Sequence, residues 1–378
     1  MKSIIITLVL VAICSLAYSA VTPGILKKTP HERYAKKLAK DGLAETPLGR
    51  QWLEVSEAAL EHPHSVSLPY RHTGYFQPDK PRSLGLKFSA KRGQRVTVSL
   101  EKQPGSDFVV YADLFKINGK DTDHLKSPDT TETSFYIDIE KTGNYILRLQ
   151  PELYRTGTYE LSVAVGPSIG FPVSGSKARV GSFWGATRDG GKRRHEGIDI
   201  FAKKLTPVVA ATDGLVIGVH NGGIGGKTVW LRSFDGNLTF YYAHLHKQMV
   251  HTGQLVKKGK VLGLVGNTGN AKTTPAHLHF GIYTLRGAID PYPFVDRTVE
   301  KAPPAPVKKL NQSLRLAKAQ QNKSGKIIVK ANTILVPVAV NAKGYLCEMP
   351  DGKIVQTSFT AVLPTTKPAK ANDVVTAP

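Results

Sequence analysis

The amino-acid sequence predicts a mainly β protein of several domains. In long stretches of the chain, hydrophobic residues alternate with other residues, and glycine-containing turns separate these runs. The length of 378 residues exceeds what one hydrophobic core usually organises, which favours several domains. Hydrophobic residues make up 41% of the chain and charged residues 21%, as in ordinary globular proteins, so most of it should fold.

The first twenty residues have the pattern of a secretory signal. Lys2 precedes an apolar run from Ile4 to Ile13, and small residues follow as far as Ala20. The run is shorter than the roughly twenty apolar residues that a membrane span requires. We therefore expect a signal peptide over 1–20, an exported protein that is periplasmic or secreted, and no stable membrane insertion once the signal is removed. A lipoprotein anchored at Cys14 is the alternative.

Cysteine content and net charge limit the chemistry. Without the signal, Cys347 is the only cysteine, which excludes an internal disulfide and a cysteine-ligated zinc site. The chain has 51 Lys and Arg against 29 Asp and Glu, a formal charge of +22, and this favours polyanionic partners. Export argues against nucleic acid as that partner, and the sequence leaves the oligomeric state open.

The segment 21–65 is expected to be helical. Hydrophobic residues such as Leu38 and Trp52 recur at helical spacings, and breaks at Gly42 and Pro47 divide the segment into two short helices.

A β-sandwich is predicted over 66–166. Runs such as Val96–Leu100 and Tyr159–Val163 alternate with period two, and short turns separate them, as in a small antiparallel sandwich. The stretch from Thr142 to Val163 resembles the pre-peptidase β-sandwich modules found beside secreted bacterial proteases. That resemblance implies either a substrate-positioning module or a spacer.

A second β-rich domain is expected over 167–298. Glycines punctuate this region, and it holds short β runs such as Thr228–Leu231 and Leu238–Tyr242.

The remaining chain divides into three parts. A Pro/Lys-rich linker is expected over 299–322, a small β module over 323–363 and a disordered tail over 364–378. The portion from Gly344 to Gly352 resembles bacterial SH3-like wall-binding modules.

The second β-rich domain concentrates histidines beside an acidic residue. His277 and His279 flank one leucine in a predicted strand, so both imidazoles emerge on one side, about 7 Å apart. That spacing suits one metal ligand and one neighbour acting on a metal-bound water. A fully extended chain would separate His195 and Asp199 by about 13 Å, so it must bend between them, and Gly197 permits the bend.

One carboxylate and two imidazoles form a donor set suited to catalytic zinc. Such sites take three protein ligands and leave the fourth position to a water whose pKa falls to about 7. His246 forms a second His-Leu-His with His244, and spacing alone does not distinguish this pair from the first. Glu196 alternates away from the metal, and we assign it no role.

The region from Gly181 to Pro293 resembles the lysostaphin-type, LytM-like zinc endopeptidases of bacterial cell walls. The resemblance rests on the ordered set of histidine motifs and on the glycines between them, such as Gly266-Asn267-Thr268-Gly269 before Pro275-Ala276-His277. It implies one Zn²⁺ per chain. The residues it implies are His195, Asp199 and His279 as ligands, His277 to orient or deprotonate the attacking water, and His244 to donate a hydrogen bond to the oxyanion.

The function expected from this resemblance is hydrolysis of peptide bonds in peptidoglycan, within stem peptides or cross-links. The family pattern marks only His244 of the second His-Leu-His, so we expect His246 to lie on the surface or behind the site. One alternative is a non-catalytic wall-binding activator of other murein hydrolases. Because the chain retains every ligand position, the sequence argues against it. A second alternative is a zinc protease acting on glycine-rich protein substrates.

Overall fold

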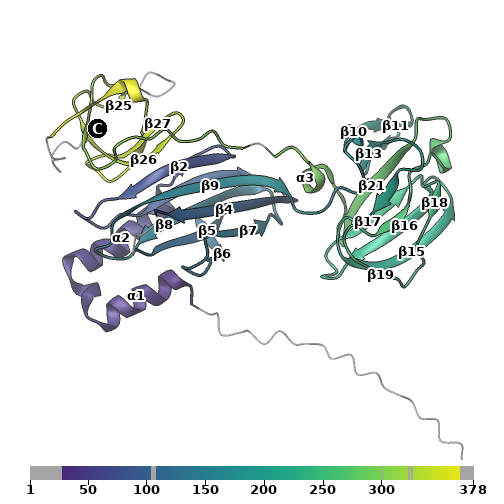
Figure 1. The fold of residues 1–378 in the computed structure, drawn as a ribbon, viewed down its shortest axis with the longest axis horizontal. Coiled ribbons are helices and arrows are strands. Elements are labelled where there is room, and N and C mark those ends of the chain that lie inside the picture. The colour runs from purple at the N-terminus through teal and green to yellow at the C-terminus, as the bar shows by residue number, and fades with distance from the viewer. Residues whose placement is uncertain (1–27, 104–107, 300, 322–323, 325–326, 367–378) are drawn as a thin grey trace, which may run out of the picture.

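The structure is a computed structural model that describes residues 28–103, 108–299, 301–321, 324 and 327–366. The fold is mostly β, as predicted, and forms two bodies joined near a short helix, α3 (Tyr292–Val295) (Figure 1). The predicted signal peptide over 1–20 lies outside the described residues. No described helix has both the length and the apolar composition to cross a membrane.

Two helices begin the described chain, α1 (Pro30–Lys40) and α2 (Pro47–Glu61), with a 3₁₀ turn between them at Leu43–Glu45. Each helix starts at a threonine whose hydroxyl accepts a hydrogen bond from the first turn, which satisfies a backbone N–H that the helix leaves free. Trp52 is buried against the sandwich, and its indole N–H donates to the Pro151 carbonyl at 2.9 Å.

The sandwich consists of two antiparallel sheets, apart from one short parallel pair, packed around a shared apolar core. One sheet has the order β1 (His64–Ser65), β3 (Leu84–Ala90), β8 (Gly143–Pro151), β5 (Val110–Asn118), β6 (Asp121–Lys126). The other contains β2 (Tyr70–Phe76), β9 (Gly157–Pro167), β4 (Gln94–Lys102) and β7 (Ser134–Asp138).

The C-terminal module extends the second sandwich sheet. Its strand β26 (Ile334–Asn341) pairs with β2 through Thr73–Val340 and Gly74–Ala339, so the module and the sandwich share one sheet. The buried Arg82 guanidinium also pairs with Glu348 at 2.7 Å. The module's other strands are β23 (Leu314–Leu316), β24 (Gln320–Gln321), β25 (Ile327–Val329), β27 (Gly344–Glu348), β28 (Ile354–Thr357) and β29 (Val362–Pro364), with a 3₁₀ turn at Phe359–Ala361.

Two predicted boundaries in this region are wrong. The linker over 299–322 is shorter, because Leu314 and Leu316 are buried in β23 and belong to the module's core. Their alternation is too brief to recognise beside the lysine-rich stretch. Pro364, the predicted start of the tail, ends β29; the rest of the tail from 367 lies outside the described residues. The SH3-like class of the module stays a prediction.

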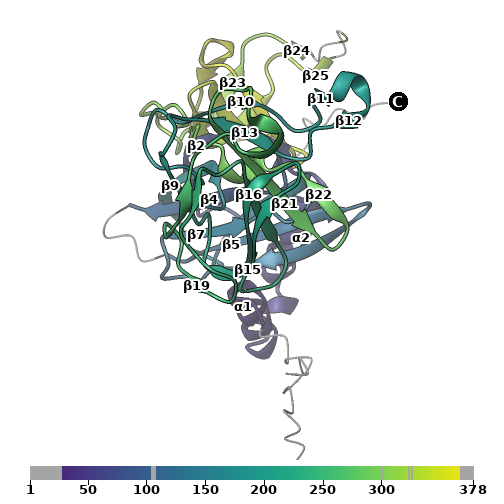
Figure 2. The same ribbon diagram turned by 90° about the vertical axis from the view of Figure 1, so that its right-hand side faces the viewer.

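The second body is built on one large sheet. In Figure 2 this body faces the viewer. Its strand order is β10 (Arg179–Ser182), β13 (Ile198–Phe201), β21 (His277–Thr284), β17 (Thr239–Ala243), β16 (Gly226–Ser233), β15 (Gly214–Gly222), β19 (Leu255–Val256). Strand β22 (Gly287–Ile289) pairs with β21, and a smaller sheet consists of β14 (Pro207–Val209), β20 (Val261–Leu264) and β18 (Lys247–Gln248). A hairpin is formed by β11 (Thr187–Arg188) and β12 (Arg193–Arg194). Two 3₁₀ turns lie at Asp189–Gly191 and Gly269–Ala271.

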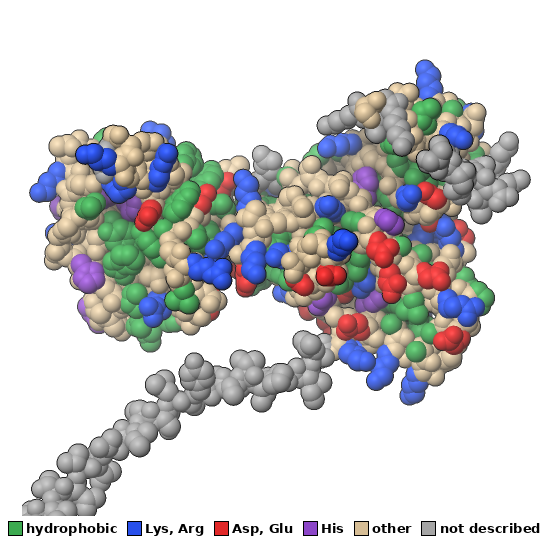
Figure 3. Space-filling model, turned by 180° about the vertical axis from the view of Figure 1, so that it is seen from behind, with side chains coloured by type: hydrophobic (Ala, Val, Ile, Leu, Met, Phe, Trp, Pro, Cys, Tyr) green, Lys and Arg blue, Asp and Glu red, His purple; other side chains and the backbone are tan. Residues whose placement is uncertain are grey.

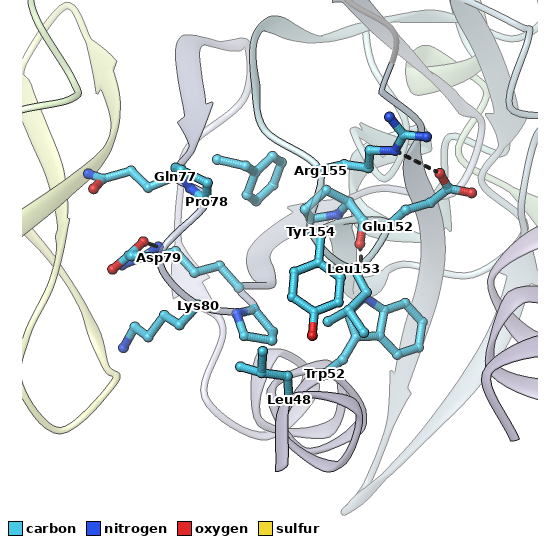
Figure 4. Close-up of a pocket in the computed structure, with 14 residues that line it drawn as sticks. Leu48, Trp52, Gln77, Pro78, Asp79, Lys80, Glu152, Leu153, Tyr154 and Arg155 are labelled. Atoms are coloured by element: carbon cyan, nitrogen blue, oxygen red, sulfur yellow. Dashed lines mark hydrogen bonds and ion pairs between the residues drawn. The ribbon is translucent and has the colours of Figure 1, made fainter. Parts of the chain in front are cut away.

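The two bodies meet where α3 packs on the sandwich. Gly93 gives the Phe294 ring room, because a β-carbon at this glycine would lie 2.3 Å from it. A separate small cavity of about 30 Å³ lies between α2 and the loop after β8, lined by Trp52 and Tyr154 among others (Figure 4). It has room for about one water and contains none of the histidines discussed above.

Candidate metal centre and active site

The structure brings the three predicted ligands together at one end of the large sheet. Asp199 on β13 and His279 on β21 are directly paired across the two strands. His195 Nε2 lies 3.0 Å from Asp199 Oδ1 and 3.0 Å from His279 Nδ1, and His279 Nδ1 lies 3.1 Å from Asp199 Oδ1. These three atoms therefore surround one point.

Gly197 allows this approach, but for a different reason from the one the sequence suggested. Its φ angle is not among the positive values, so a left-handed bend is not what requires glycine here. A β-carbon at this position would lie 2.7 Å from the His279 ring and 2.7 Å from the Phe280 carbonyl oxygen. Glycine is needed because the chain passes too close to His279 for any side chain.

The hydrogen bonds of His195 fix the direction of its free lone pair. Its ring is buried, with 2% exposed, and Nδ1 lies 3.0 Å from the Phe183 carbonyl oxygen. A carbonyl can only accept, so Nδ1 carries the proton and Nε2 presents a lone pair to Asp199 and His279. This is the tautomer that a metal-ligating imidazole requires.

The three ligand atoms fit a divalent cation. Acceptor atoms that face one another at 3.0–3.1 Å repel unless a proton or a cation lies between them. In tetrahedral zinc sites with bonds of about 2.0–2.1 Å, ligand atoms lie roughly 3.3 Å apart. The structure therefore contains a candidate His/Asp metal site, formed by His195, Asp199 and His279.

Local charge keeps the carboxylate of this cluster ionised. Burial raises the pKa of Asp199, but the adjacent imidazoles of His195 and His279 outweigh burial and lower the pKa overall. Burial lowers the pKa of His279. A carboxylate beside neutral imidazoles is the protonation state that metal binding needs.

His277 and His244 lie beside the three ligands, with their rings 5.1 Å apart. In each ring Nδ1 is held by a backbone carbonyl at 2.8 Å, that of Pro275 for His277 and that of Thr268 for His244. His277 Nε2 lies 4.0 Å from Asp199 Oδ1. Both rings are thus held by one nitrogen, which leaves the other available to a reacting group.

The backbone at His244 turns this side chain toward the site. A continued strand would point position 244 toward the core with Phe240 and Tyr242. Instead β17 ends at Ala243, and His244 has a φ of 62°, a left-handed conformation that non-glycine residues adopt at some cost. Its ring consequently lies 5.9 Å from that of His279.

Electrostatics favour the neutral form of His244. Burial is the main reason that its pKa falls to about 4, and the neighbouring His277 lowers it further. His246 and Glu196 are exposed, and neither belongs to the His195–Asp199–His279 cluster. The expectation that His246 lies on the surface agrees with its exposure.

Two polar residues beside the cluster were missed by the sequence reasoning. Arg188 Nη2 donates to Asp199 Oδ2 at 2.6 Å and to Ser182 Oγ at 2.7 Å. No motif marks either residue, because their contact with Asp199 depends on how β10 and the β11–β12 hairpin fold against β13.

A row of partly buried aromatic rings also extends from the cluster. The Tyr241 ring lies 5.8 Å from that of His279 and 4.3 Å from that of Trp230, which lies 5.4 Å from Tyr283. We call Trp230, Tyr241 and Tyr283 the ring row. Alternation along the strand could have identified Tyr283, which is four residues beyond His279 and so shares its face.

A β-sheet domain that presents two imidazoles and a carboxylate, with two further histidines beside them, is the arrangement of a metal-dependent hydrolase. Residues 193–291 match the model of peptidase family M23. The chain therefore contains an M23 peptidase domain, homologous to lysostaphin-type and LytM-type endopeptidases.

Two relatives and one solved structure illustrate the similarity. An L-Ala–D-Glu endopeptidase of Bacillus subtilis is 39% identical over 124 residues, covering 30% of this chain and 38% of the relative. The peptidoglycan DD-endopeptidase ShyC of Vibrio cholerae is 36% identical over 88 residues, covering 23% of this chain and 20% of the relative. The catalytic domain of lysostaphin from Staphylococcus simulans is 33% identical, covering 31% of this chain and 91% of that domain, with a TM-score of 0.29.

The similarity to the two endopeptidases is confined to part of each protein. The matched segments span less than two fifths of either relative and less than a third of this chain. The residues that match the family model, 193–291, lie within the second body, where the candidate metal site lies.

Proposed function

We propose that this chain is an exported zinc metalloendopeptidase that hydrolyses peptide bonds in peptidoglycan, within stem peptides or cross-links. The observation that carries the proposal is the convergence of His195 Nε2, Asp199 Oδ1 and His279 Nδ1 within 3.0–3.1 Å of one another. The names of relatives that share this domain, a DD-endopeptidase of peptidoglycan and an L-Ala–D-Glu endopeptidase, support the substrate class. The complete ligand set argues against a non-catalytic activator.

His195, Asp199 and His279 would hold one Zn²⁺. The donor set contains no thiol and offers three ligands, which is typical of catalytic rather than structural zinc sites. When bound, zinc supplies a Lewis acid and lowers the pKa of a coordinated water to about 7.

His277 would accept the proton of the attacking water. Its Nδ1–H donates to the Pro275 carbonyl, so the Nε2 lone pair is free, and that nitrogen lies 4.0 Å from the Asp199 oxygen that faces the ligand cluster. A base held in this way can return its proton to the amine that leaves.

His244 would stabilise the charge that develops on the carbonyl oxygen. It can donate from Nε2 only in its protonated form, because Nδ1–H is already held by the Thr268 carbonyl. Burial and His277 lower its pKa to about 4, so the ring is neutral before reaction. We propose that the negative charge of the transition state favours a proton on His244 Nε2. The proton taken from water would then be shared between the neighbouring rings of His277 and His244.

The ring row would contact the substrate next to the scissile bond. Its first ring, Tyr241, lies beside His279, and the row continues along the same face of the sheet. Rings in this position offer apolar contact area at small entropic cost.

Other parts of the chain would direct its export and hold it at the cell wall. The predicted signal at 1–20 would direct export, and the sandwich would act as a spacer. On the face shown in Figure 3, Lys and Arg lie across both bodies, whereas Asp and Glu gather mainly on the body that holds the sandwich. The overall charge of +22 would attract the protein to an anionic cell wall.

The test compares digestion of purified peptidoglycan sacculi by the wild type and by His195→Ala, with bound zinc measured in parallel. His246→Ala is the matched control, because this exposed histidine lies outside the cluster. We expect the wild type and His246→Ala to bind one zinc and release peptides, and His195→Ala to do neither. Peptide release by His195→Ala contradicts the mechanism, whereas cleavage of a glycine-rich polypeptide but not of sacculi contradicts the substrate.

A further inference from the structure

The two oxygens of the Asp199 carboxylate have different neighbours. Oδ1 faces His195 Nε2 at 3.0 Å and His279 Nδ1 at 3.1 Å, within the ligand cluster. Oδ2 accepts a hydrogen bond from Arg188 Nη2 at 2.6 Å. One oxygen is therefore directed at the metal site and the other is occupied by a guanidinium.

Arg188 is itself supported by a second contact. The same Nη2 donates to Ser182 Oγ at 2.7 Å, and Ser182 lies opposite Asp199 at a bulge between β10 and β13. Ser182 Oγ is also 3.4 Å from His195 Nδ1. The Arg188 side chain is 29% exposed and that of Asp199 only 11%, so solvent screens this pair less than a surface ion pair.

A carboxylate can bind a cation through one oxygen or through both, and these modes use different numbers of coordination positions. A catalytic zinc must keep one position for water, so binding through both oxygens would compete with that water. A guanidinium on Oδ2 opposes binding through both oxygens, because the hydrogen bond from Nη2 occupies Oδ2 and its positive charge disfavours a cation at that oxygen.

We propose that Arg188 is a positioning residue that restricts Asp199 to binding the metal through Oδ1 alone. This inference rests on the proposed metal site. Arg188 comes from the β11–β12 hairpin, so it links the order of that hairpin to the geometry of the ligand. Residues that orient a ligand from outside typically change metal affinity or activity by about 10- to 100-fold when removed.

The test uses Arg188→Ala and Arg188→Lys, with Arg194→Ala as the matched control. Arg194 is an exposed arginine on the other strand of the same hairpin, and it donates to Thr187 Oγ1 rather than to a ligand. Zinc dissociation constants are measured by competition with a chromogenic chelator. The absorption spectrum of the cobalt-substituted protein reports the coordination number, because four-coordinate cobalt absorbs more strongly than five-coordinate cobalt.

For Arg188→Ala we expect a zinc dissociation constant about 10- to 100-fold above that of the wild type and a weaker cobalt absorption. Arg188→Lys should fall between the two, because an ammonium restores charge without the planar fork, and Arg194→Ala should match the wild type. Ser182→Ala is measured as well, because it keeps the ion pair and removes the hydroxyl that supports Arg188, together with that hydroxyl's longer contact of 3.4 Å with His195 Nδ1. Ser182→Ala should raise the zinc dissociation constant by a few-fold. This variant provides a test even if Arg188→Ala does not fold.

A wild-type dissociation constant and cobalt spectrum in Arg188→Ala would overturn the inference, as would an unchanged Ser182→Ala if Arg188→Ala does not fold. Failure of the proposed function looks different, because the wild type itself would then bind no zinc or release no peptides. The two failures are therefore distinguishable in one set of measurements.

Discussion

Both bodies of the molecule bury histidines, but they use the ring nitrogens differently. In the sandwich, His72 is fully buried, and its two nitrogens lie 3.0 Å from the Tyr70 hydroxyl and 3.3 Å from the Tyr159 hydroxyl. In the peptidase domain, His195, His277 and His244 each use Nδ1 on a backbone carbonyl and direct the other nitrogen toward shared space.

The difference teaches that burial alone does not identify a functional histidine. A histidine whose nitrogens are both paired within its own domain stabilises the fold. A histidine with one nitrogen paired and the other aimed at a second ligand atom is prepared to bind or to react. Substitutions in the two bodies should therefore affect different measured quantities.

The largest effect is expected from Asp199→Ala. Removing the only carboxylate of the cluster leaves two imidazoles for the metal, so peptidase activity on sacculi should fall by more than about 10³-fold with loss of bound zinc. Asp213→Ala is the control, since this acid lies in the same domain and pairs with Lys257 at the surface. Activity in Asp199→Ala above a tenth of the wild-type value would contradict the assignment of Asp199 as a metal ligand that peptidase activity requires.

His277→Ala should separate chemistry from metal binding. We expect kcat to fall by about 10²–10⁴-fold, because a general base is lost, while the zinc content stays at the wild-type level. Steady-state kinetics and metal analysis of the same preparation check this. Loss of zinc in His277→Ala would instead make this residue a ligand.

Part of the metal site could be predicted because it depends on a local rule, since alternation along a strand places His277 and His279 on one face. The choice of His195, Asp199 and His279 as the ligands came instead from the resemblance to lysostaphin-type endopeptidases. What the sequence did not reveal depends on contacts between distant segments. Arg188 reaches Asp199 only because a hairpin folds against β10 and β13.

The same reasoning explains the misplaced boundaries of the C-terminal module. The short strand β23, which the predicted linker included, joins the module by pairing with β26 and β29, and no local pattern encodes those partners. The turn at His244 was equally hidden, because a φ of 62° at a histidine is set by its surroundings rather than by its residue type.

In the sandwich, Asp113→Ala should change stability and not catalysis. Asp113 and Arg148 are both buried and pair at 2.7 Å, so removing the carboxylate leaves an uncompensated buried guanidinium. We expect the free energy of unfolding of the sandwich to fall by about 3–5 kcal/mol, with unchanged kcat for the folded fraction. Urea unfolding measures this, and Glu160→Ala, which breaks the exposed pair with Arg71, should cost less than about 1 kcal/mol.

His72 should make the sandwich sensitive to acid. Burial lowers its pKa to about 3, and the nearby His64 adds to the effect. The unfolded chain protonates this histidine near its ordinary pKa of about 6.5, so between these values the unfolded state binds more protons and stability falls as the pH falls. Between pH 7 and pH 5 we expect a loss of about 2 kcal/mol, read from urea midpoints. His72→Gln places an uncharged amide between the same two tyrosines and should make the free energy of unfolding less dependent on pH. An equally steep pH dependence in this variant would show that other titrating groups cause the loss of stability.

The smallest effect is expected from Trp230→Ala in the ring row. Trp230 touches Tyr241 and Tyr283 but not the ligands, so its loss should weaken substrate contact without altering the metal or the two neighbouring histidines. An aromatic contact worth about 1 kcal/mol corresponds to a rise in KM of roughly five-fold with kcat unchanged. Trp230→Phe should recover most of this, and Phe234→Ala, an exposed ring just beyond the end of the same strand, should have no effect. A fall in kcat with constant KM would show instead that the ring row supports the geometry of His279 through Tyr241.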